Sequence, residues 1–451
     1  MKSVYMFSPL PPVPSGIAAY THAVAEALAT QSGYDVHVVV DQPEVSVQGH
    51  YTVHSWREFL YRPLPPESVS IYQVGNSVHH HFVYPFVLTY PGLVVLHDLV
   101  LGHGRLQLFH AAHSPDELHA EIAYETDDRF ATTVLRAFQS GYAWEHIPFF
   151  VPLHRTVIES AVSTAVHNPD TYRTLRMRYP DLHFTYIPMG LWETEPRIPS
   201  NNAAVRHAVR TALGIPPGSL LLGTFGLLTP HKGVATILTA MRILRALRYP
   251  VYLLLVGYRA SGLDVAQLAQ DEGVHAYVRI VYQADRRTYW QLLQSVDVCI
   301  ALRAPPVGEC SLSTLEMMAA GRPVIMNRHR FNVFFPEHTC IRINLSTGVD
   351  DLIEQVRKLY HRPEIRYRIG QHAQRYVRRY HNFNTTIACY HRWIEMYPHL
   401  LRQWRDRRTQ FPQHAVPLTR RVHAQIRQRV NWLPDFLTQH IHRIMIGDPS
   451  R

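Results

Sequence analysis

Short apolar runs alternate with amphipathic stretches along most of this chain. The runs have the length of β-strands, and the stretches between them have helical spacing, as in 17–28, where apolar residues recur on one face. This alternation is typical of βα units and predicts mostly parallel sheets. In the first half we expect strands at 3–8, 35–40, 69–74, 93–97, 162–166 and 183–187. In the second half we expect strands at 219–226, 250–256, 277–282, 296–302 and 322–326, and helices at 233–247, 286–294, 312–320 and 348–360.

The two series predict an α/β protein with two Rossmann-like domains. Residues 193–202 are polar and proline-containing, which indicates a linker between the domains. Two such sheets joined once leave a central cleft, to which both present the carboxyl ends of their strands.

Beyond about residue 400 the pattern becomes basic and amphipathic. Residues 402–408 and 420–429 are arginine-rich, and tryptophans at 404 and 432 are interleaved with them. Such segments either lie on anionic membranes or pack on the protein body with a solvated face, and the sequence leaves both open.

The segment 305–325 is the strongest candidate for chemistry. It is predicted to form a strand end, a tight loop, a short helix and a new strand. Glu316 falls on the apolar stripe of that helix, so we expect it to point inward, where a carboxylate needs hydrogen-bond donors. A helix that begins at the carboxyl end of a parallel strand is also where α/β proteins bind phosphorylated ligands. A sugar nucleotide would supply hydroxyls for Glu316 and phosphates for the helix.

An alternative for Glu316 is a capping box. Ser313 to Glu316 fits that pattern, in which the glutamate accepts from a serine amide and the helix begins at Thr314.

The segment 225–233 also follows a predicted strand and opens a helix. Gly226 lets the chain turn close to a ligand, and Lys232 would be a point charge for a diphosphate. The alternative is that Lys232 is an exposed loop lysine.

Two segments of the first half are weaker candidates. The proline-rich loop 8–16 ends in Ser15 and Gly16, which open a helix and can offer backbone amides to a phosphate or sugar; it can equally be a surface turn. His97 and Asp98 end an apolar strand, where the histidine would hydrogen-bond a sugar hydroxyl and the aspartate would position an acceptor. Alternatively His97 is a core histidine and Asp98 caps a helix.

A run of histidines and one arginine are further candidates. The histidines at 79–81 are consecutive, so they point in different directions, and no carboxylate or cysteine lies at ligand spacing; we expect a pocket contact by one of them and no metal site. Arg303 would contact a diphosphate, or would pair with Glu309 or Glu316.

Composition narrows the class of protein. With 451 residues, of which 46% are hydrophobic, the chain can build two full cores. Its 45 basic and 35 acidic residues give a net charge of +10, which favours anionic partners. The four cysteines lack paired spacing, and no apolar run is long enough to span a bilayer, so we expect reduced thiols in a soluble or peripheral cytoplasmic protein.

Over about residues 1–400 these motifs resemble the GT-B glycosyltransferases of the large retaining group called family 4. The loop 8–17 is similar to the family's glycine loop, 225–233 to its phosphate-binding loop and 308–325 to its donor-binding glutamate motif. His97 lies where the family often has a histidine that contacts the donor sugar. Two positions depart from the pattern: the first of the two usual glutamates would fall on Gly308, with Glu309 one place later, and Leu227 stands where arginine is common.

The resemblance implies a retaining, metal-independent hexosyltransferase that needs no cofactor and uses a nucleoside-diphosphate sugar as donor. It implies an acceptor-side domain at 1–195, a nucleotide-sugar-binding domain at 203–380, a helix at 381–400 that crosses back to the first domain and an extension at 401–451. The catalytic residues expected are His97, Asp98, Lys232 and Glu309. The donor-binding residues expected are Ser15, Gly16, Gly226, Lys232, Arg303, Glu309, Ser311, Leu312 and Glu316.

The sequence does not reveal the base or the sugar of the donor, or which acceptor is used. We expect the acceptor to be a glycan, a lipid or a small molecule. We expect no nucleic-acid partner and a cytoplasmic location, with the basic extension suited to the inner face of the membrane. The alternatives are a non-catalytic membrane- or nucleic-acid-binding protein on the same fold, and a sugar-nucleotide epimerase.

Overall fold

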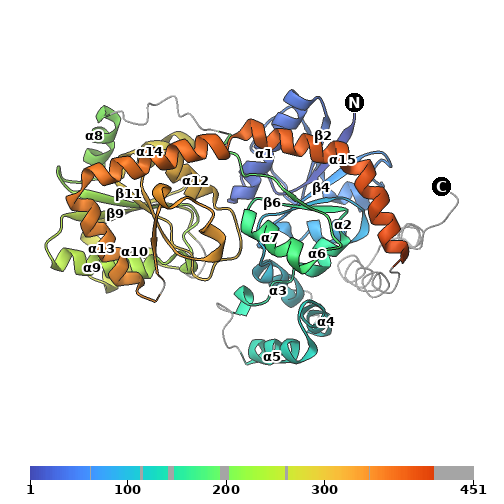
Figure 1. Ribbon diagram of the computed structural model, residues 1–451, viewed down its shortest axis with the longest axis horizontal. Helices are drawn as coiled ribbons and strands as arrows, with labels where there is room; N and C mark the ends of the chain where they lie inside the picture. Colours follow the sequence, from blue (N-terminus) through green and yellow to red (C-terminus); the bar gives the residue numbers. More distant parts are fainter. Residues whose placement is uncertain are drawn as a thin grey trace. The chain divides into compact units, whose positions relative to one another are not determined.

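The computed structural model describes residues 1–60, 62–111, 115–140, 147–192, 203–259, 263–344 and 346–410. The chain forms two compact units (Figure 1). Unit 1 comprises Met1–Pro188, Val307–Cys310 and Thr386–Arg451, and unit 2 comprises Met189–Pro306 and Ser311–Thr385. The predicted linker at 193–202 and the basic segment 420–429 lie outside the described residues.

Unit 1 is built on a seven-stranded, wholly parallel sheet with the order β3-β2-β1-β4-β5-β6-β7. The six predicted strands are confirmed. Only β3 was missed, because its short polar sequence lies at an exposed edge of the sheet. The strands are β1 (Ser3–Phe7), β2 (Asp35–Val40), β3 (Thr52–Ser55), β4 (Val69–Val74), β5 (Leu93–Leu96), β6 (Ser163–Val166) and β7 (Phe184–Tyr186).

The helices of unit 1 are α1 (Gly16–Ser32), α2 (Val83–Thr89), α3 (Gly102–Ala111), α4 (Pro115–Glu125), α5 (Asp128–Gln139), α6 (Arg155–Ser160), α7 (Pro169–Arg178) and the long α15 (Phe383–Gln410). A small apolar cluster joins α3, α4 and α5. Beside it, the buried Arg105 donates to Glu121 over 2.9 Å, so the charge of each is compensated.

Helix α15 completes unit 1. Trp393 is buried and donates from Nε1 to Ser163 Oγ on β6 over 2.8 Å. Further along, Trp404 is buried and Arg407 donates to the carbonyl of Asp181 over 3.0 Å. The first of the two arginine-rich segments therefore packs on the protein body.

Unit 2 is built on a six-stranded parallel sheet with the order β10-β9-β8-β11-β12-β13. The five predicted strands are confirmed, and the three-residue β13 was too short to detect. The strands are β8 (Leu220–Phe225), β9 (Val251–Gly257), β10 (Val278–Tyr282), β11 (Val298–Ile300), β12 (Val324–Asn327) and β13 (Ile341–Ile343).

The four predicted helices of unit 2 are confirmed as α9 (Val234–Ala246), α11 (Arg286–Ser295), α12 (Leu312–Ala319) and α13 (Gly348–His361). They are joined by α8 (Ala203–Ala212), α10 (Val265–Asp271) and α14 (Pro363–Tyr380). Figure 1 shows α9, α10 and α13 on one side of this sheet and α8, α12 and α14 on the other.

The two sheets share one strand order. In each, the chain starts in a central strand, moves to one edge and then returns to continue on the other side, so the order reverses between β1 and β4 and between β8 and β11. Ligands of open α/β sheets bind at the carboxyl ends of the strands at this reversal. The fold is the predicted pair of Rossmann-like domains. Among the described helices, none combines the length and the apolar character that a bilayer span needs.

Candidate functional site

The point of reversal in unit 2 lies between two loops that the sequence had singled out. Gly226 directly follows β8, and the loop after β11 contains Arg303. The two loops are joined by a backbone hydrogen bond of 2.8 Å from Ala304 N to His231 O. The fold therefore brings these two motifs, 77 residues apart, to one place at the sheet edge.

Gly226, Lys232 and Ser313 form the centre of this site. Gly226 has a left-handed φ of +97°, and a Cβ there would lie 3.1 Å from Lys232 Nζ and 3.3 Å from Ser313 Oγ. The Lys232 side chain is only 8% exposed, so the alternative of an exposed loop lysine is wrong. The ammonium group thus lies beside a bare stretch of backbone, close to the start of α12.

Close backbone packing supports this loop from behind. Gly257 ends β9, and a Cβ there would lie 1.9 Å from the carbonyl oxygen of Gly226. Only glycine fits at position 257, so the path of the loop at Gly226 is fixed by the neighbouring strand.

Helix α12 begins at Leu312, with Ser311 as its N-cap. Ser311 Oγ accepts from the backbone N–H of Thr314 over 3.3 Å and from Arg303 Nη2 over 2.5 Å. The capping-box alternative for Glu316 is therefore wrong, because the helix starts earlier and Ser311 caps it. Leu312 and Ser313 occupy the first turn, where helix N–H groups have no intrahelical partner.

Glu316 points inward as predicted and is 3% exposed. Its Oε2 accepts from Tyr289 Oη over 2.7 Å, and its Oε1 pairs with Arg286 Nη1 over 2.7 Å. Burial, and then the negative charge of Glu316, raise the pKa of Tyr289 well above its usual value, so the phenol remains a donor.

Sequence reasoning missed Arg286 and Tyr289. Both come from the first turn of α11, where Asp285 is the N-cap and accepts from Thr288 N. The start of that helix was readable, but nothing in the local pattern indicated that it packs against α12.

In unit 1, Ser15 and Gly16 open α1 as predicted. Ser15 is the N-cap, and its Oγ accepts from Ile17 N over 3.2 Å. The loop thus ends in a capped helix N-terminus at the carboxyl end of β1, next to the point where the strand order of this sheet reverses.

His97 follows β5 and is buried. Its Nε2 lies 2.7 Å from Gln73 Oε1, and its ring meets that of Tyr20 edge-on. Burial, with His167 and His80 nearby, holds the pKa of His97 well below its usual value, so the ring is neutral. Asp98 accepts from the backbone N–H of Asn76, in the loop after β4, over 3.1 Å.

The segment Val307–Cys310, which contains Glu309, belongs to unit 1. The carbonyl of Val307 accepts from Leu99 N over 2.8 Å, and Thr171 Oγ1 donates to the carbonyl of Gly308 over 2.8 Å. Glu309 itself accepts from Val307 N through Oε2 over 3.1 Å. The structure therefore groups Glu309 with the residues that follow His97 and Asp98, and groups Glu316 with Lys232 and Arg303.

The three consecutive histidines have separate surroundings. His80 is buried and its Nδ1 lies 2.9 Å from the carbonyl of Gln73, whereas His81 Nε2 lies 2.7 Å from the carbonyl of Gly104. Burial lowers the pKa of His80 to about 4. Within the described ranges, no group of three or more His, Cys, Asp or Glu side chains could hold a metal ion.

Comparison with known proteins shows which family part of this chain matches. Residues 205–376 match the family described as glycosyl transferases group 1, whereas no curated protein sequence matches the chain. Sucrose-phosphate synthase from Thermosynechococcus elongatus has a similar structure, with a TM-score of 0.62 at 15% identity over 89% of this chain and 99% of that one. HepE from Anabaena, solved with UDP and glucose, has a TM-score of 0.61 at 14% identity over 86% and 98%.

A third similar structure is WaaG, a glycosyltransferase involved in lipopolysaccharide biosynthesis, with a TM-score of 0.60 at 16% identity over 84% of this chain and 95% of that one. At such low identities these structures show the fold and nothing finer. Residues 205–376 thus match the group 1 glycosyltransferases, and the chain has the GT-B fold over most of its length.

Proposed function

We propose that this protein is a retaining glycosyltransferase that moves a sugar from a nucleoside-diphosphate sugar to a hydroxyl of a glycan, a lipid or a small molecule. The observation that carries the proposal is the site in unit 2. A buried lysine beside a bare glycine and a buried glutamate lie where the strand order of a parallel sheet reverses.

In this proposal the donor binds to unit 2. The diphosphate lies against Gly226, where no side chain obstructs it, with Lys232 and the first N–H groups of α12 as its positive partners. Arg303, which already fixes the N-cap Ser311, adds a second cation.

Glu316 holds the ribose. Each of its carboxylate oxygens has two lone pairs, and the contacts to Tyr289 and Arg286 use one lone pair on each oxygen. One acceptor site per oxygen therefore remains for the ribose hydroxyls.

Unit 1 supplies the acceptor side. His97 is neutral, and its contact with Gln73 Oε1 makes Nε2 the protonated nitrogen, so Nδ1 is the acceptor for a sugar hydroxyl. Asp98 and Glu309 orient the acceptor through hydrogen bonds.

Transfer breaks the bond between the anomeric carbon and the diphosphate oxygen and forms a bond from the acceptor oxygen to that carbon on the same face. The acceptor proton passes to the leaving phosphate oxygen. Lys232 and the α12 N-terminus stabilise the charge that develops on the diphosphate, so the reaction needs neither a divalent metal nor a cofactor.

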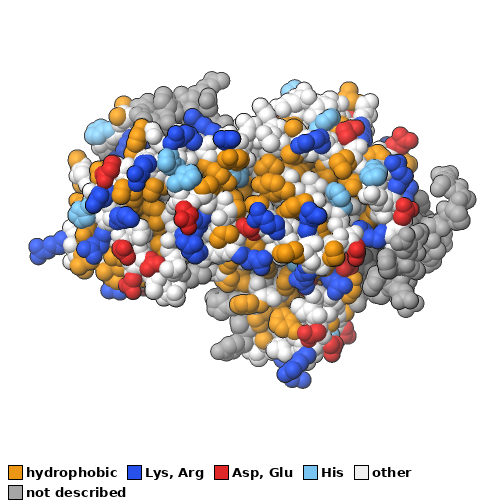
Figure 2. All heavy atoms as spheres, in the orientation of Figure 1, with side chains coloured by type: hydrophobic (Ala, Val, Ile, Leu, Met, Phe, Trp, Pro, Cys, Tyr) orange, Lys and Arg blue, Asp and Glu red, His pale blue; other side chains and the backbone are white. Residues whose placement is uncertain are grey.

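The face of the molecule drawn in Figure 2 lacks the charge pattern of a nucleic-acid-binding protein. Figure 2 shows Lys and Arg side chains spread over the visible face and mixed with Asp and Glu. Nucleic-acid binding uses a continuous basic stripe or patch.

The direct test is an assay of the purified protein with UDP-, GDP- and ADP-sugars, with EDTA present, followed by NMR of the product anomer. UDP-glucose is the first donor to try, since a structural neighbour has been solved with it. We expect turnover with retained configuration, loss in Glu316→Gln and no loss in Glu272→Gln, a matched change at a surface ion pair of unit 2. The proposal would be contradicted if the protein neither transferred nor hydrolysed any of these donors. It would also be contradicted if the two variants had equal turnover.

We further propose that the basic extension attaches the protein to anionic membranes. Because Trp404 is buried in unit 1, the deletion that tests this should begin at residue 411 and leave α15 intact. Removal of 411–451 should weaken pelleting with anionic liposomes and spare nucleotide binding; unchanged pelleting would count against it.

A further inference from the structure

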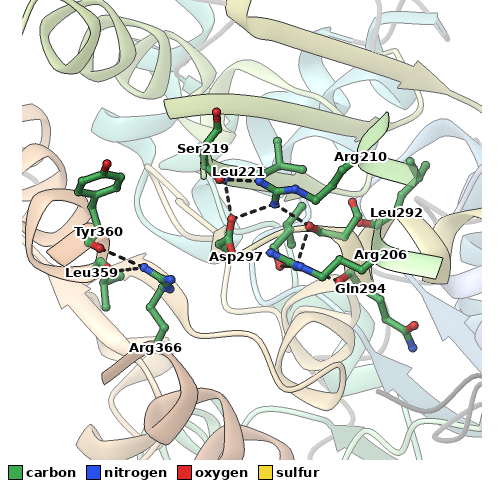
Figure 3. A network of polar contacts seen from close by, with 12 residues as sticks. Arg206, Arg210, Ser219, Leu221, Leu292, Gln294, Asp297, Leu359, Tyr360 and Arg366 are labelled. Atoms are coloured by element: carbon green, nitrogen blue, oxygen red, sulfur yellow. Dashed lines mark hydrogen bonds and ion pairs between the residues drawn. The ribbon is translucent and has the colours of Figure 1, made fainter. Parts of the chain in front are cut away.

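Strand β11 has only three residues, and polar side chains hold both of its ends. Its backbone pairs at two positions with β8 and at two with β12. At the amino end, Asp297 accepts from the backbone N–H of Leu221 over 2.8 Å and pairs with Arg206 Nη2 over 2.6 Å (Figure 3). Because the strands are parallel, this end lies at the edge of the sheet opposite to Gly226.

At the carboxyl end of β11 the clamp is Asn327, the last residue of β12. Its Oδ1 accepts from the backbone N–H of Arg303 over 2.6 Å, and its Nδ2 donates to the carbonyl of Arg303 over 2.6 Å. The side chain is 1% exposed, so water hardly competes for these bonds. One amide side chain thus pairs with both backbone groups of Arg303, in place of a neighbouring strand.

Asn327 is itself fixed by groups outside this loop. It lies opposite Ile343 of β13, and its carbonyl accepts from Nδ2 of the buried Asn332 over 2.7 Å. The amide is therefore held by the sheet and by the segment after β12, so it can determine the position of Arg303.

The loop that Asn327 holds is linked to the proposed donor site at two points. Arg303 Nη2 donates to Oγ of Ser311, the N-cap of α12, over 2.5 Å. Ala304 N donates over 2.8 Å to the carbonyl of His231, which directly precedes Lys232. The first bond connects the loop to the start of α12, and the second connects it to the turn that carries Lys232.

We propose that Asn327 is a positioning residue of the donor site, which acts on the diphosphate through the loop of Arg303 and Ala304. The inference rests on the proposed function, since it concerns the groups that hold the diphosphate there. Charged groups stabilise a diphosphate best when they are preorganised. Loss of the amide should therefore weaken binding of the diphosphate group and spare contacts to the nucleoside.

Calorimetric titration of the full-length protein tests this with two probes. UDP, GDP and ADP are first compared on the wild type, and the one that binds most tightly is then compared with its own nucleoside. Asn327→Ala removes both hydrogen bonds to Arg303 and should weaken binding of the diphosphate by about tenfold, with the affinity for the nucleoside unchanged. A purely structural role would weaken binding of both.

Two further variants serve as controls. Arg206→Gln loosens the clamp at the other end of β11 and should lower the melting temperature without a change in either affinity. Asn327→Asp keeps an acceptor for the N–H of Arg303 but turns a carboxylate oxygen towards its carbonyl. Protonation restores a donor there, and burial raises the pKa of a carboxyl group. Affinity for the diphosphate, relative to the wild type at the same pH, should therefore recover as the pH is lowered from 8 to 6.

The outcomes separate this inference from the proposed function. Equal losses of both affinities in Asn327→Ala, no loss at all, or no recovery in Asn327→Asp would overturn the role of Asn327 and leave the proposed function standing. A wild type that binds none of the three diphosphates would contradict the proposed function itself.

Discussion

The two units have the same strand order but place different chemistry where that order reverses. In unit 1, His97 at the end of β5 is buried in its neutral form and bonded to Gln73. In unit 2, Lys232 is buried beside Gly226, and Glu316 is buried against Arg286. A shared frame therefore does not determine a shared ligand, since the side chains on its loops do.

The difference follows from the charge of the ligands proposed for each unit. A diphosphate needs fixed positive charge, which is most effective where water is excluded. A sugar hydroxyl needs no fixed positive charge, only a hydrogen-bond acceptor or donor within reach. Each of the following predictions tests whether the units really divide in this way.

The largest expected effect is a difference in acid stability. The described part of unit 1 buries His80, His97, His154 and His167, whereas that of unit 2 buries His381. A histidine that stays neutral in the fold takes up a proton only on unfolding, so stability falls as pH drops from 6.5 towards the folded pKa. With a folded pKa of about 4, His80 alone accounts for a loss of about 3 kcal/mol over that window.

Unit 1 should therefore lose its structure first on acidification. Hydrogen exchange at pH 7, 6, 5 and 4.5 should show loss of protection in β4 and β5 before β8 and β9. His80→Gln should make the stability of unit 1 less dependent on pH. Simultaneous loss of protection in both units would refute the expected difference in their acid stability.

The next largest effect is expected from Lys232→Ala. Removal of a preorganised charge from a diphosphate site should lower kcat by about 100- to 1,000-fold. Lys358→Ala, at an exposed position of α13, should leave kcat unchanged. A loss below tenfold in Lys232→Ala would place the catalytic charge elsewhere.

A pair of glycine substitutions should separate the two units. Gly308 has a φ of +83°, and a Cβ there would lie 2.5 Å from Leu99 Cβ, so Gly308→Ala should cost unit 1 about 1–3 kcal/mol. Nucleotide affinity should hardly change. Gly226→Ala, at a φ of +97°, should also cost some stability, but it should in addition weaken binding of UDP, because its Cβ would enter the space beside Lys232. Calorimetric titration with UDP and thermal unfolding of both variants measure this, and identical effects would contradict the division.

The smallest effect is expected from Tyr289→Phe. It removes one hydrogen bond to the buried Glu316 while Arg286 still pairs with it, so nucleotide binding should weaken by about tenfold or less, near 1 kcal/mol. Tyr282→Phe, at an exposed position, is the control. A loss as large as that of Glu316→Gln would show that Tyr289 contacts the ligand directly.

The sequence was sufficient for most of the fold because buried parallel strands are continuous apolar runs. It failed at β3 and β13, where the strand is polar and exposed or only three residues long. The inward direction of Glu316 could be predicted from its place on an apolar stripe. Its partners Arg286 and Tyr289 could not, because their proximity arises from the packing of α11 near α12.

The charge and burial of the site residues could likewise be predicted from the sequence only in part. Lys232 was a candidate from its place before a helix, but its surroundings include Gly226, in the loop after β8, and Ser313, in the first turn of α12.

The place of Trp393 in the core of unit 1 has a consequence for synthesis on the ribosome. Its partner Ser163 is made about 230 residues earlier, and all of unit 2 is synthesised between them. Domains usually fold in the order in which they emerge. Here the first unit to emerge must wait with an open sheet face until α15 leaves the ribosome, so the second unit is the first that can finish folding.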